Sequence, residues 1–321
     1  MNGLYFAKSL SNMNILVAGC AGFIGSHFVD LLVSKRRLGD YIVGYDRLTY
    51  AGLLSNVNQS IDEFISGDIC NSTLLQYVCT KNKIDWIVNF AAETHVDNSI
   101  KGCNEFVDTN VKGVLSILDA CRLFDIKYLH VSTDEVYGPA DIGISFIESD
   151  RFAPMNPYAA TKAAAEHLVQ SYINTHNVAA KIVRPCNNFG PRQHDEKFIP
   201  TIINAIKAQQ AVPVYGDGNQ IRDWLFVRDC AAMIYDVFMR GQFSAAYNLT
   251  VKNELTNNEL VSMLHGFMNV EYNKNIKYVN DRPGHDRRYS IDNALFNTHM
   301  GFYTCVPFNA ALHETVAYYA S

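Results

Sequence analysis

The sequence has no long apolar run, no clustered cysteines and no excess of basic residues. No apolar run approaches the ~18 residues that span a bilayer, so we expect no membrane partner. The eight cysteines lack metal-type spacing and no secretory signal precedes them, which predicts reduced thiols, no metal and a cytoplasmic protein. The net charge of -5 offers no basic field for a phosphate backbone, so we expect no nucleic-acid partner.

The composition is that of a chain that folds around a substantial core. The 321 residues are 48% apolar and 18% charged, enough for one large domain or two modest ones. Residues 1–12 precede the first strand pattern. We expect them to be a loose extension on a fold that begins at Asn14.

Aliphatic runs alternate with stretches of helical spacing in the first part of the chain. The runs predict strands at residues 14–18, 41–45, 62–66, 85–90, 127–132 and 179–184. Helical spacing predicts helices over residues 23–33, 73–80, 109–124 and 158–174. Strands and helices in alternation form a parallel, doubly wound sheet covered on both faces. We therefore predict a Rossmann-type α/β fold.

The alternation loosens after Pro185. Glycine and proline punctuate the later segments and helices are fewer, which predicts a smaller mixed α/β lobe at the C-terminal end. We assign residues 13–185 to the Rossmann domain, which would also receive part of 222–250. Residues 186–321 are assigned mainly to the smaller lobe.

Three glycines mark the first strand-to-helix turn, in the segment GCAGFIG. Gly19, Gly22 and Gly25 allow a tight turn, a close approach of backbone N–H groups to a pyrophosphate, and tight packing of helix on sheet. The spacing is G-x-x-G-x-x-G, so the turn alone is also compatible with a glycine-rich turn without a ligand. Phe23 and Ile24, which lie within the turn, are further candidates for cofactor contact.

An acidic residue ends the second predicted strand. Asp46 lies about 20 residues after Gly25, where an acidic side chain accepts hydrogen bonds from the adenosine ribose hydroxyls. This pattern favours NAD over NADP. Arg47 follows directly and could attract a 2'-phosphate, so the alternative stays open at this point.

A tyrosine and a lysine stand four residues apart in the segment YAATK. Tyr158 and Lys162 share one face of a helix, where an ammonium near a phenol favours the phenolate and lowers its pKa. A tyrosine tuned in this way can take a proton from a sugar hydroxyl while a nicotinamide accepts a hydride. The pair is a weak pattern alone and becomes specific beside the glycine turn and Thr133.

Two adjacent carboxylates, Asp134 and Glu135, follow the fifth predicted strand in the segment TDEVYG. Alone, two like charges side by side repel each other and favour a solvated turn. Their place after Thr133, at the carboxyl end of a strand, directs them instead to the crevice of Tyr158 and Lys162.

Several small or polar residues share this position at the carboxyl end of a predicted strand. They are Gly19, Asp46, Asp68, Ala91, Thr133 and Asn187. Ligands bind at this edge of open parallel sheets, so the separate motifs converge on one crevice.

The chain resembles extended short-chain dehydrogenase/reductases. The motifs found in the family's order are GCAGFIGS, AAETHVDNSI, STDEVYG, YAATKAAAEH, NNFGP, GDGNQIRDWLFVRD and DRPGHDRRYSID. More narrowly, they resemble nucleotide-sugar 4,6-dehydratases of the dTDP-glucose 4,6-dehydratase type, from about Asn14 to the C-terminus. The resemblance implies NAD as cofactor and a nucleotide-diphosphate hexose as substrate. It also implies a 4-keto-6-deoxy product, of the kind that feeds rhamnose-type sugars.

The resemblance implies a role for each catalytic candidate. Glu135 would take the C5 proton, Asp134 would protonate the departing C6 hydroxyl, and Thr133 would hydrogen-bond the C4 oxygen beside Tyr158. Lys162 would also hold the nicotinamide ribose. The acid must hold a proton while the base is ionised, so the two adjacent carboxyls would need different environments.

Other positions carry over from the family one at a time. Asp68 and Ile69 after the third strand, and Ala91 and Ala92 after the fourth, would contact the cofactor. The substrate contacts would be Glu93, Asn187, Asn188, Arg222, Arg282 and His285. The arginines would clamp the diphosphate by bidentate contact. His95 has two interpretations of equal weight, a substrate contact or a structural histidine.

Other function classes remain open. A UDP-hexose 4-epimerase or a decarboxylase shares the fold, Tyr158 and Lys162, but such an epimerase needs no acid and base at C5 and C6. A regulatory protein with a dead site would not need those residues intact. The base stays open between thymidine and uridine. By analogy with the family, a homodimer would form through the helices at 109–124 and 158–174.

Overall fold

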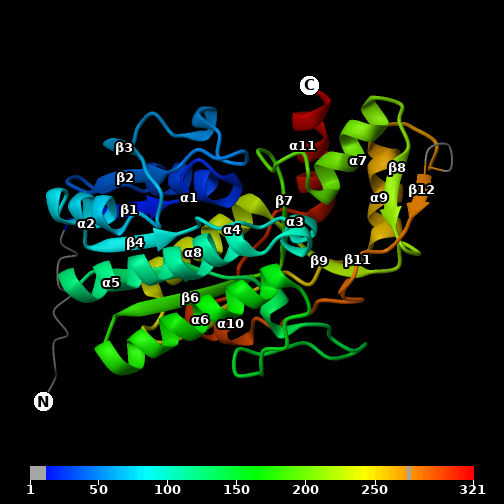
Figure 1. Ribbon diagram of the computed structural model, residues 1–321. Helices are drawn as coiled ribbons and strands as arrows, with labels where there is room; N and C mark the ends of the chain where they lie inside the picture. The colour runs from blue at the N-terminus through cyan, green and yellow to red at the C-terminus, as the bar shows by residue number, and fades with distance from the viewer. Residues whose placement is uncertain (1–11, 273–275) are drawn as a thin grey trace, which may run out of the picture.

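A seven-stranded parallel sheet, in the order β10-β6-β5-β4-β1-β2-β3, forms the centre of the larger lobe (Figure 1). This computed structural model describes residues 12–272 and 276–321, so the expected N-terminal extension lies, except for Asn12, outside the described residues. The strands are β1 (Asn14–Ala18), β2 (Tyr41–Asp46), β3 (Glu63–Ser66), β4 (Trp86–Asn89), β5 (Lys127–Val131), β6 (Ala180–Pro185) and β10 (Ala246–Leu249).

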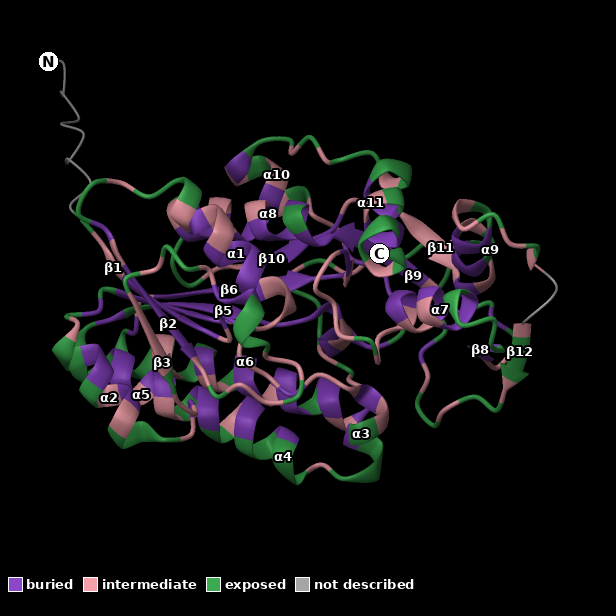
Figure 2. Ribbon diagram, turned by 90° about the horizontal axis from the view of Figure 1, so that it is seen from above, coloured by how far each residue is buried: buried purple, intermediate pink, exposed green. Residues whose placement is uncertain are grey.

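Helices cover both faces of this sheet (Figure 2). One face carries α1 (Phe23–Ser34), α8 (Val227–Arg240) and α10 (Ala294–Met300). The other carries α2 (Ser72–Lys81), the π-helix η2 (Val107–Gly113), α5 (Val114–Phe124) and α6 (Pro157–His176). Strands buried on both faces favour apolar runs, which is the pattern of β1 and β4. The predicted Rossmann-type fold is confirmed.

The smaller lobe is mixed, as predicted. Its three-stranded sheet contains β7 (Asn187–Phe189), β9 (Ile221–Phe226) and β11 (Glu254–Thr256), and its two-stranded sheet contains β8 (Val212–Tyr215) and β12 (Ile276–Val279). Its helices are α7 (Phe198–Lys207), α9 (Asn257–Phe267) and α11 (Phe308–Ala320). The remaining short elements are η1 (Leu54–Asn56), α3 (Val96–Lys101), α4 (Asn104–Phe106) and η3 (Asp134–Tyr137).

The chain crosses between the lobes more than once. The six predicted strands are β1 to β6, and the seventh, β10, lies within the 222–250 segment, part of which was assigned to this domain, and pairs with β6. Helix α8 also returns to the larger lobe, where Met233 and Phe238 pack in one core with Phe28 of α1. The helix expected over 109–124 begins with η2, whose wider turn precedes α5.

None of the helices within residues 12–272 and 276–321 combines the length and the apolar character that a membrane crossing requires.

A buried ion pair joins α6 to β6 behind the site described below. Arg184 donates to Glu166 with Nη2–Oε2 at 2.8 Å, and both side chains are almost fully buried. Arg184 also donates to the hydroxyl of Tyr137, the last residue of η3. A buried charge is tolerated only when it is paired, so this pair fixes how α6, β6 and η3 lie against one another.

Breaking this pair on one side is expected to destabilise the fold. Glu166→Gln leaves the Arg184 guanidinium buried without a counter-charge, which lowers the free energy of unfolding by about 3–5 kcal/mol. Asp236→Asn, which breaks the more exposed pair with Arg240, should change it by less than about 1 kcal/mol. Urea unfolding of both variants measures the difference. Equal effects would show that the buried pair contributes no more than a surface pair.

Candidate active site

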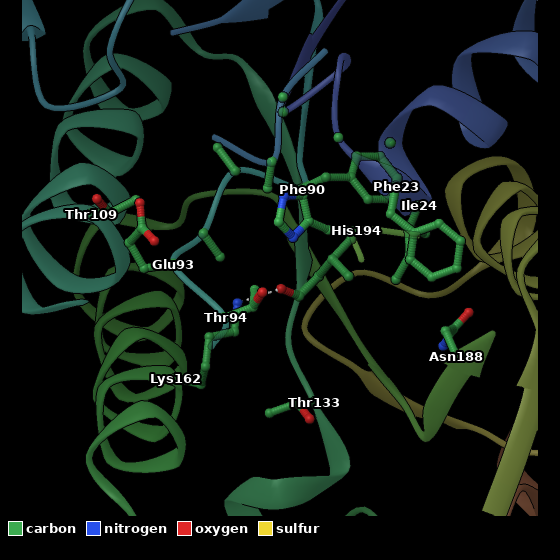
Figure 3. Close-up of a pocket in the computed structure, with 18 of the residues that line it drawn as sticks. Phe23, Ile24, Phe90, Glu93, Thr94, Thr109, Thr133, Lys162, Asn188 and His194 are labelled. Carbon is green, nitrogen blue, oxygen red and sulfur yellow. Dashed lines mark hydrogen bonds between the residues drawn. The ribbon is translucent and has the colours of Figure 1, made fainter. Parts of the chain in front are cut away.

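The predicted site residues gather at the carboxyl ends of the parallel strands, around one cavity of about 300 Å³. Figure 3 shows Glu93 and Thr109 on one side of this cavity, Phe23 and Ile24 on the other, and Lys162 of α6 below them. The predicted residues that line it are Gly19, Gly22, Phe23, Ile24, Gly25, Asp46, Asp68, Ile69, Ala91, Ala92, Glu93, Thr133, Asp134, Glu135, Tyr158, Lys162, Asn187 and Asn188. Arg222, Arg282 and His285 are not among its lining residues.

The glycine turn between β1 and α1 leaves no room for a side chain at Gly19 or Gly25. Gly19 has φ +79°, and a Cβ there would lie 2.5 Å from the Ala91 backbone nitrogen. A Cβ on Gly25 would overlap the Gly19 carbonyl oxygen. Within the described chain, no side chain caps α1 and its first turn holds no acidic residue. The helix N-terminus is therefore left open to an anionic group such as a pyrophosphate.

Asp46, which ends β2, and Arg47, which follows it, are both held by hydrogen bonds or ion pairs. The Asp46 carboxylate accepts from the Ala21 and Leu48 backbone N–H groups at 3.0 and 2.8 Å. Arg47 is held in two ion pairs, with Asp68 at 3.1 Å and Glu93 at 2.7 Å. The guanidinium expected to compete for a 2'-phosphate is thus already bound by two carboxylates.

Tyr158 and Lys162 lie on one face at the start of α6, but their electrostatics differ from the expectation. Burial and the charge of Glu135 raise the pKa of Tyr158, and a hydrogen bond with Thr133 only partly opposes them. Lys162 donates to the Val131 carbonyl at 2.7 Å, and burial lowers its pKa to about 8. The expected lowering of the tyrosine pKa by the lysine is therefore wrong for this structure, because burial dominates both groups.

The adjacent carboxyls have contrasting environments. Asp134 is buried, and burial followed by the charge of Glu135 raises its pKa well above the usual range. Thr133 Oγ1 donates to Asp134 Oδ1 at 3.2 Å, while Oδ2 has no hydrogen-bond partner among the described residues. A carboxyl that is buried, protonated and has one uncommitted oxygen can donate a proton to a group in the cavity.

Glu135 is more exposed and is held by hydrogen bonds from two other elements. Asn156, the N-cap of α6, donates from Nδ2 to Glu135 Oε2 at 3.1 Å. The hydroxyl of Tyr289 lies 3.3 Å from the same oxygen and 2.5 Å from Asp286 Oδ2. The Glu135 carboxylate thus lines the cavity in a fixed position beside Asp134, where it can act as a base.

Arg222, Arg282 and His285, which do not line the cavity, contact aromatic rings or carboxylates beside it. Arg222 is buried, with its guanidinium carbon 4.1 Å from the ring centre of Tyr289. Arg282 donates to Asp97 at 3.3 Å. Burial, followed by the charges of Arg282 and Arg222, lowers the pKa of His285 to about 4. Arg222 thus stacks on the tyrosine whose hydroxyl lies 3.3 Å from Glu135 Oε2.

Several residues that line the cavity or support its lining were not predicted from the sequence. Lys197 donates to the Thr94 carbonyl at 2.8 Å, and both residues line the cavity. Asn110 in η2 accepts from the Glu93 N–H and donates to Thr161 of α6. For Asn156, which donates to Glu135, the sequence holds one signal: asparagine followed by proline is typical of the N-cap and first residue of a helix.

A parallel sheet with this glycine turn, an acidic residue ending β2 and a tyrosine-lysine pair on one helix is the arrangement of short-chain dehydrogenase/reductases. The chain belongs to the nucleotide-sugar 4,6-dehydratase family, since the model described as GDP-mannose 4,6 dehydratase matches residues 16–315. The family expected from the sequence motifs is confirmed.

Relatives match over nearly the whole chain. The low-salt glycan biosynthesis protein Agl12 of Haloferax volcanii is 43% identical and covers 96% of this chain and 98% of its own. A dTDP-glucose 4,6-dehydratase of Neisseria gonorrhoeae is 38% identical, covering 95% of each chain. The structure of DesIV, a dTDP-glucose 4,6-dehydratase from Streptomyces venezuelae solved with NAD bound, superposes with a TM-score of 0.91 at 38% identity, covering 96% of this chain and 97% of that one.

Proposed function

We propose that the protein is an NDP-glucose 4,6-dehydratase that converts dTDP-glucose or UDP-glucose into the 4-keto-6-deoxy sugar nucleotide and water. One observation carries the proposal: two adjacent carboxyls, one buried with a raised pKa and one held by donors, share a cavity with Tyr158 and Lys162. An epimerase acting at C4 alone does not need this pair. The relatives named dTDP-glucose 4,6-dehydratase favour thymidine as the base.

The cofactor is NAD. The glycine turn gives its pyrophosphate the space and the N–H groups described above, and Asp46 would accept from the adenosine ribose. The ion pairs of Arg47 with Asp68 and Glu93 leave no free guanidinium at that position for a 2'-phosphate. Lys162 would hold the nicotinamide ribose. When bound, NAD supplies the oxidation at C4 and the reduction at C6 that completes the cycle.

The oxidation needs a base at the C4 hydroxyl. Tyr158 would take this proton, with the Thr133 hydroxyl bonded to the same oxygen and the Lys162 ammonium one turn along the helix. Because burial raises the pKa of Tyr158, the phenol depends on nearby positive charge to accept and return the proton.

The elimination needs a base and an acid on neighbouring carbons. Once C4 is a ketone, the C5 proton is acidic, and Glu135 would remove it. The electron pair of the C5–H bond forms the C5=C6 bond, and the C6 hydroxyl leaves as water with a proton from Asp134. The diphosphate would lie toward Asn187 and the arginines at 222 and 282, with Glu93 and His285 near the sugar nucleotide.

Incubation with dTDP-glucose or UDP-glucose tests the proposal. We expect a 4-keto sugar nucleotide, detected by its alkali-induced absorbance and by mass spectrometry as the loss of one water. The ratio of the two turnover rates identifies the preferred base. A 4-epimer without a keto product would overturn the proposal in favour of an epimerase, and no reaction with either substrate would also overturn it.

A homodimer and a cytoplasmic location are part of the same proposal. Helices α5 and α6 lie side by side on one face of the sheet (Figure 1), and α5 exposes Leu115, Leu123 and Phe124. Apolar side chains on an outer helix face support pairing with a second copy. The eight cysteines, none of them in a disulfide, support a reducing compartment.

A further inference from the structure

Asn156 has two hydrogen-bond roles at once. As the N-cap of α6, its Oδ1 accepts from the Ala159 backbone N–H at 2.8 Å. Its Nδ2 donates to Glu135 Oε2 at 3.1 Å. The residue is 5% exposed; its bond with Ala159 is buried and its bond to Glu135 is partly buried. One amide therefore connects the helix of Tyr158 to the carboxylate of Glu135.

The cap leaves the amide only one orientation. A buried backbone N–H must be met by an acceptor, and the amide oxygen is the only acceptor of the Asn156 side chain. Flipping the amide would turn NH2 against the Ala159 N–H and the oxygen against the Glu135 carboxylate, two repulsive contacts. The donor that faces Glu135 is thus fixed by the start of α6 rather than by the loop that holds Glu135.

The position of the donor selects one oxygen of the base. Among the described residues, Asn156 donates to Oε2 of Glu135, and the Tyr289 hydroxyl, which Glu135 shares with Asp286, lies 3.3 Å from the same oxygen. Oε1 is the oxygen left to take a proton. Ordering a free glutamate side chain costs up to about 2 kcal/mol of conformational entropy. Because the donor already holds the Glu135 side chain in place, less of this entropy is lost when the reaction takes place.

We propose that Asn156 is a positioning residue that holds the Glu135 carboxylate in the direction needed for proton removal at C5 and ties it to the helix of Tyr158. The inference rests on the proposed function, in which Glu135 is the base. In that step the C5–H bond breaks, Oε1 gains the proton, the C5=C6 bond forms, and the C6 oxygen leaves as water with the proton of Asp134. C5 takes a proton back when C6 is reduced, so a reaction in D2O labels the product at C5.

Two variants separate the positioning role from the cap. Asn156→Ser keeps a good N-cap, but its side chain ends one bond short of Nδ2. Asn156→Asp keeps both the cap and the shape, and replaces the donor by a second carboxylate oxygen. We expect Ser to slow product formation and C5 labelling roughly 10- to 100-fold, as for the loss of a bond to a charged group, and Asp to slow them more.

The control is the same substitution at an asparagine that also accepts from a backbone N–H and donates to a carboxylate, but caps no described helix. Asn58 accepts from the Ser60 N–H at 2.8 Å and donates to the Asp30 carboxylate at 2.7 Å, away from the cavity. Asn58→Ser should leave turnover unchanged. Turnover of all variants is measured with dTDP-glucose as the substrate. Thermal melting of the same variants checks that the Asn156 variants are folded.

The decisive measurement is the split between the two half-reactions. In a single turnover, the variants at Asn156 should reduce the cofactor at the wild-type rate but form product and C5 label slowly. Wild-type rates in both half-reactions, or equal losses in both, would overturn the inference and leave the proposed function standing. If the wild-type enzyme forms no keto product at all, the proposed function falls and the inference falls with it.

Discussion

Glu135→Gln is expected to stop the elimination while leaving the first oxidation intact. Glutamine has the shape of glutamate and still accepts a hydrogen bond from Asn156, but its amide cannot take the C5 proton. Loss of a general base typically costs 10²–10⁴-fold, so we expect about this reduction in the rate of keto-product formation. The reduced cofactor should then accumulate, because Tyr158 and Lys162 are unchanged.

Absorbance of the reduced cofactor and mass spectrometry of the sugar nucleotide measure the two steps separately. Glu105→Gln is the matched control, because Glu105 is an exposed glutamate outside the cavity lining. It should behave as wild type. Product formation by Glu135→Gln at close to the wild-type rate would remove Glu135 as the base and would leave the contrast between the two carboxyls without a function.

Most of the larger lobe could be predicted because its sequence signals are local. The strands β1 to β6 are short apolar runs separated by helical spacing, and each begins and ends within two residues of its prediction. The strand β10 could not be predicted in the same way. Its four residues join the sheet through pairing with β6, more than sixty positions earlier, and short apolar runs do not specify such a partner.

The glycine turn and the residues at strand ends were predictable for the same reason. Topology alone brings the carboxyl ends of parallel strands to one edge, so Gly19, Asp46 and Thr133 meet without further information. The electrostatics were not predictable. The pKa of Tyr158 depends on burial and on Glu135, which belongs to another element, and the donor role of Asn156 depends on the orientation of one amide.

Tyr158→Phe is expected to block the reaction before the step that Glu135 serves. Phenylalanine keeps the ring, which packs beside Val96 and Phe106, and removes only the hydroxyl. Without it no group takes the proton of the C4 hydroxyl, so we expect the rate of cofactor reduction to fall about 10²–10⁴-fold. NAD binding should persist, since Asp46, Lys162 and the glycine turn are untouched.

The two variants therefore differ in what accumulates. Glu135→Gln should hold reduced cofactor and oxidised sugar, whereas Tyr158→Phe should hold neither, although both fail to release product.

Tyr77→Phe, on the exposed face of α2, is the control for loss of a hydroxyl and should turn over normally. Rapid cofactor reduction by Tyr158→Phe would assign the C4 proton to another group. Thr133 would then be the candidate, because it is the other hydroxyl hydrogen-bonded within this part of the cavity.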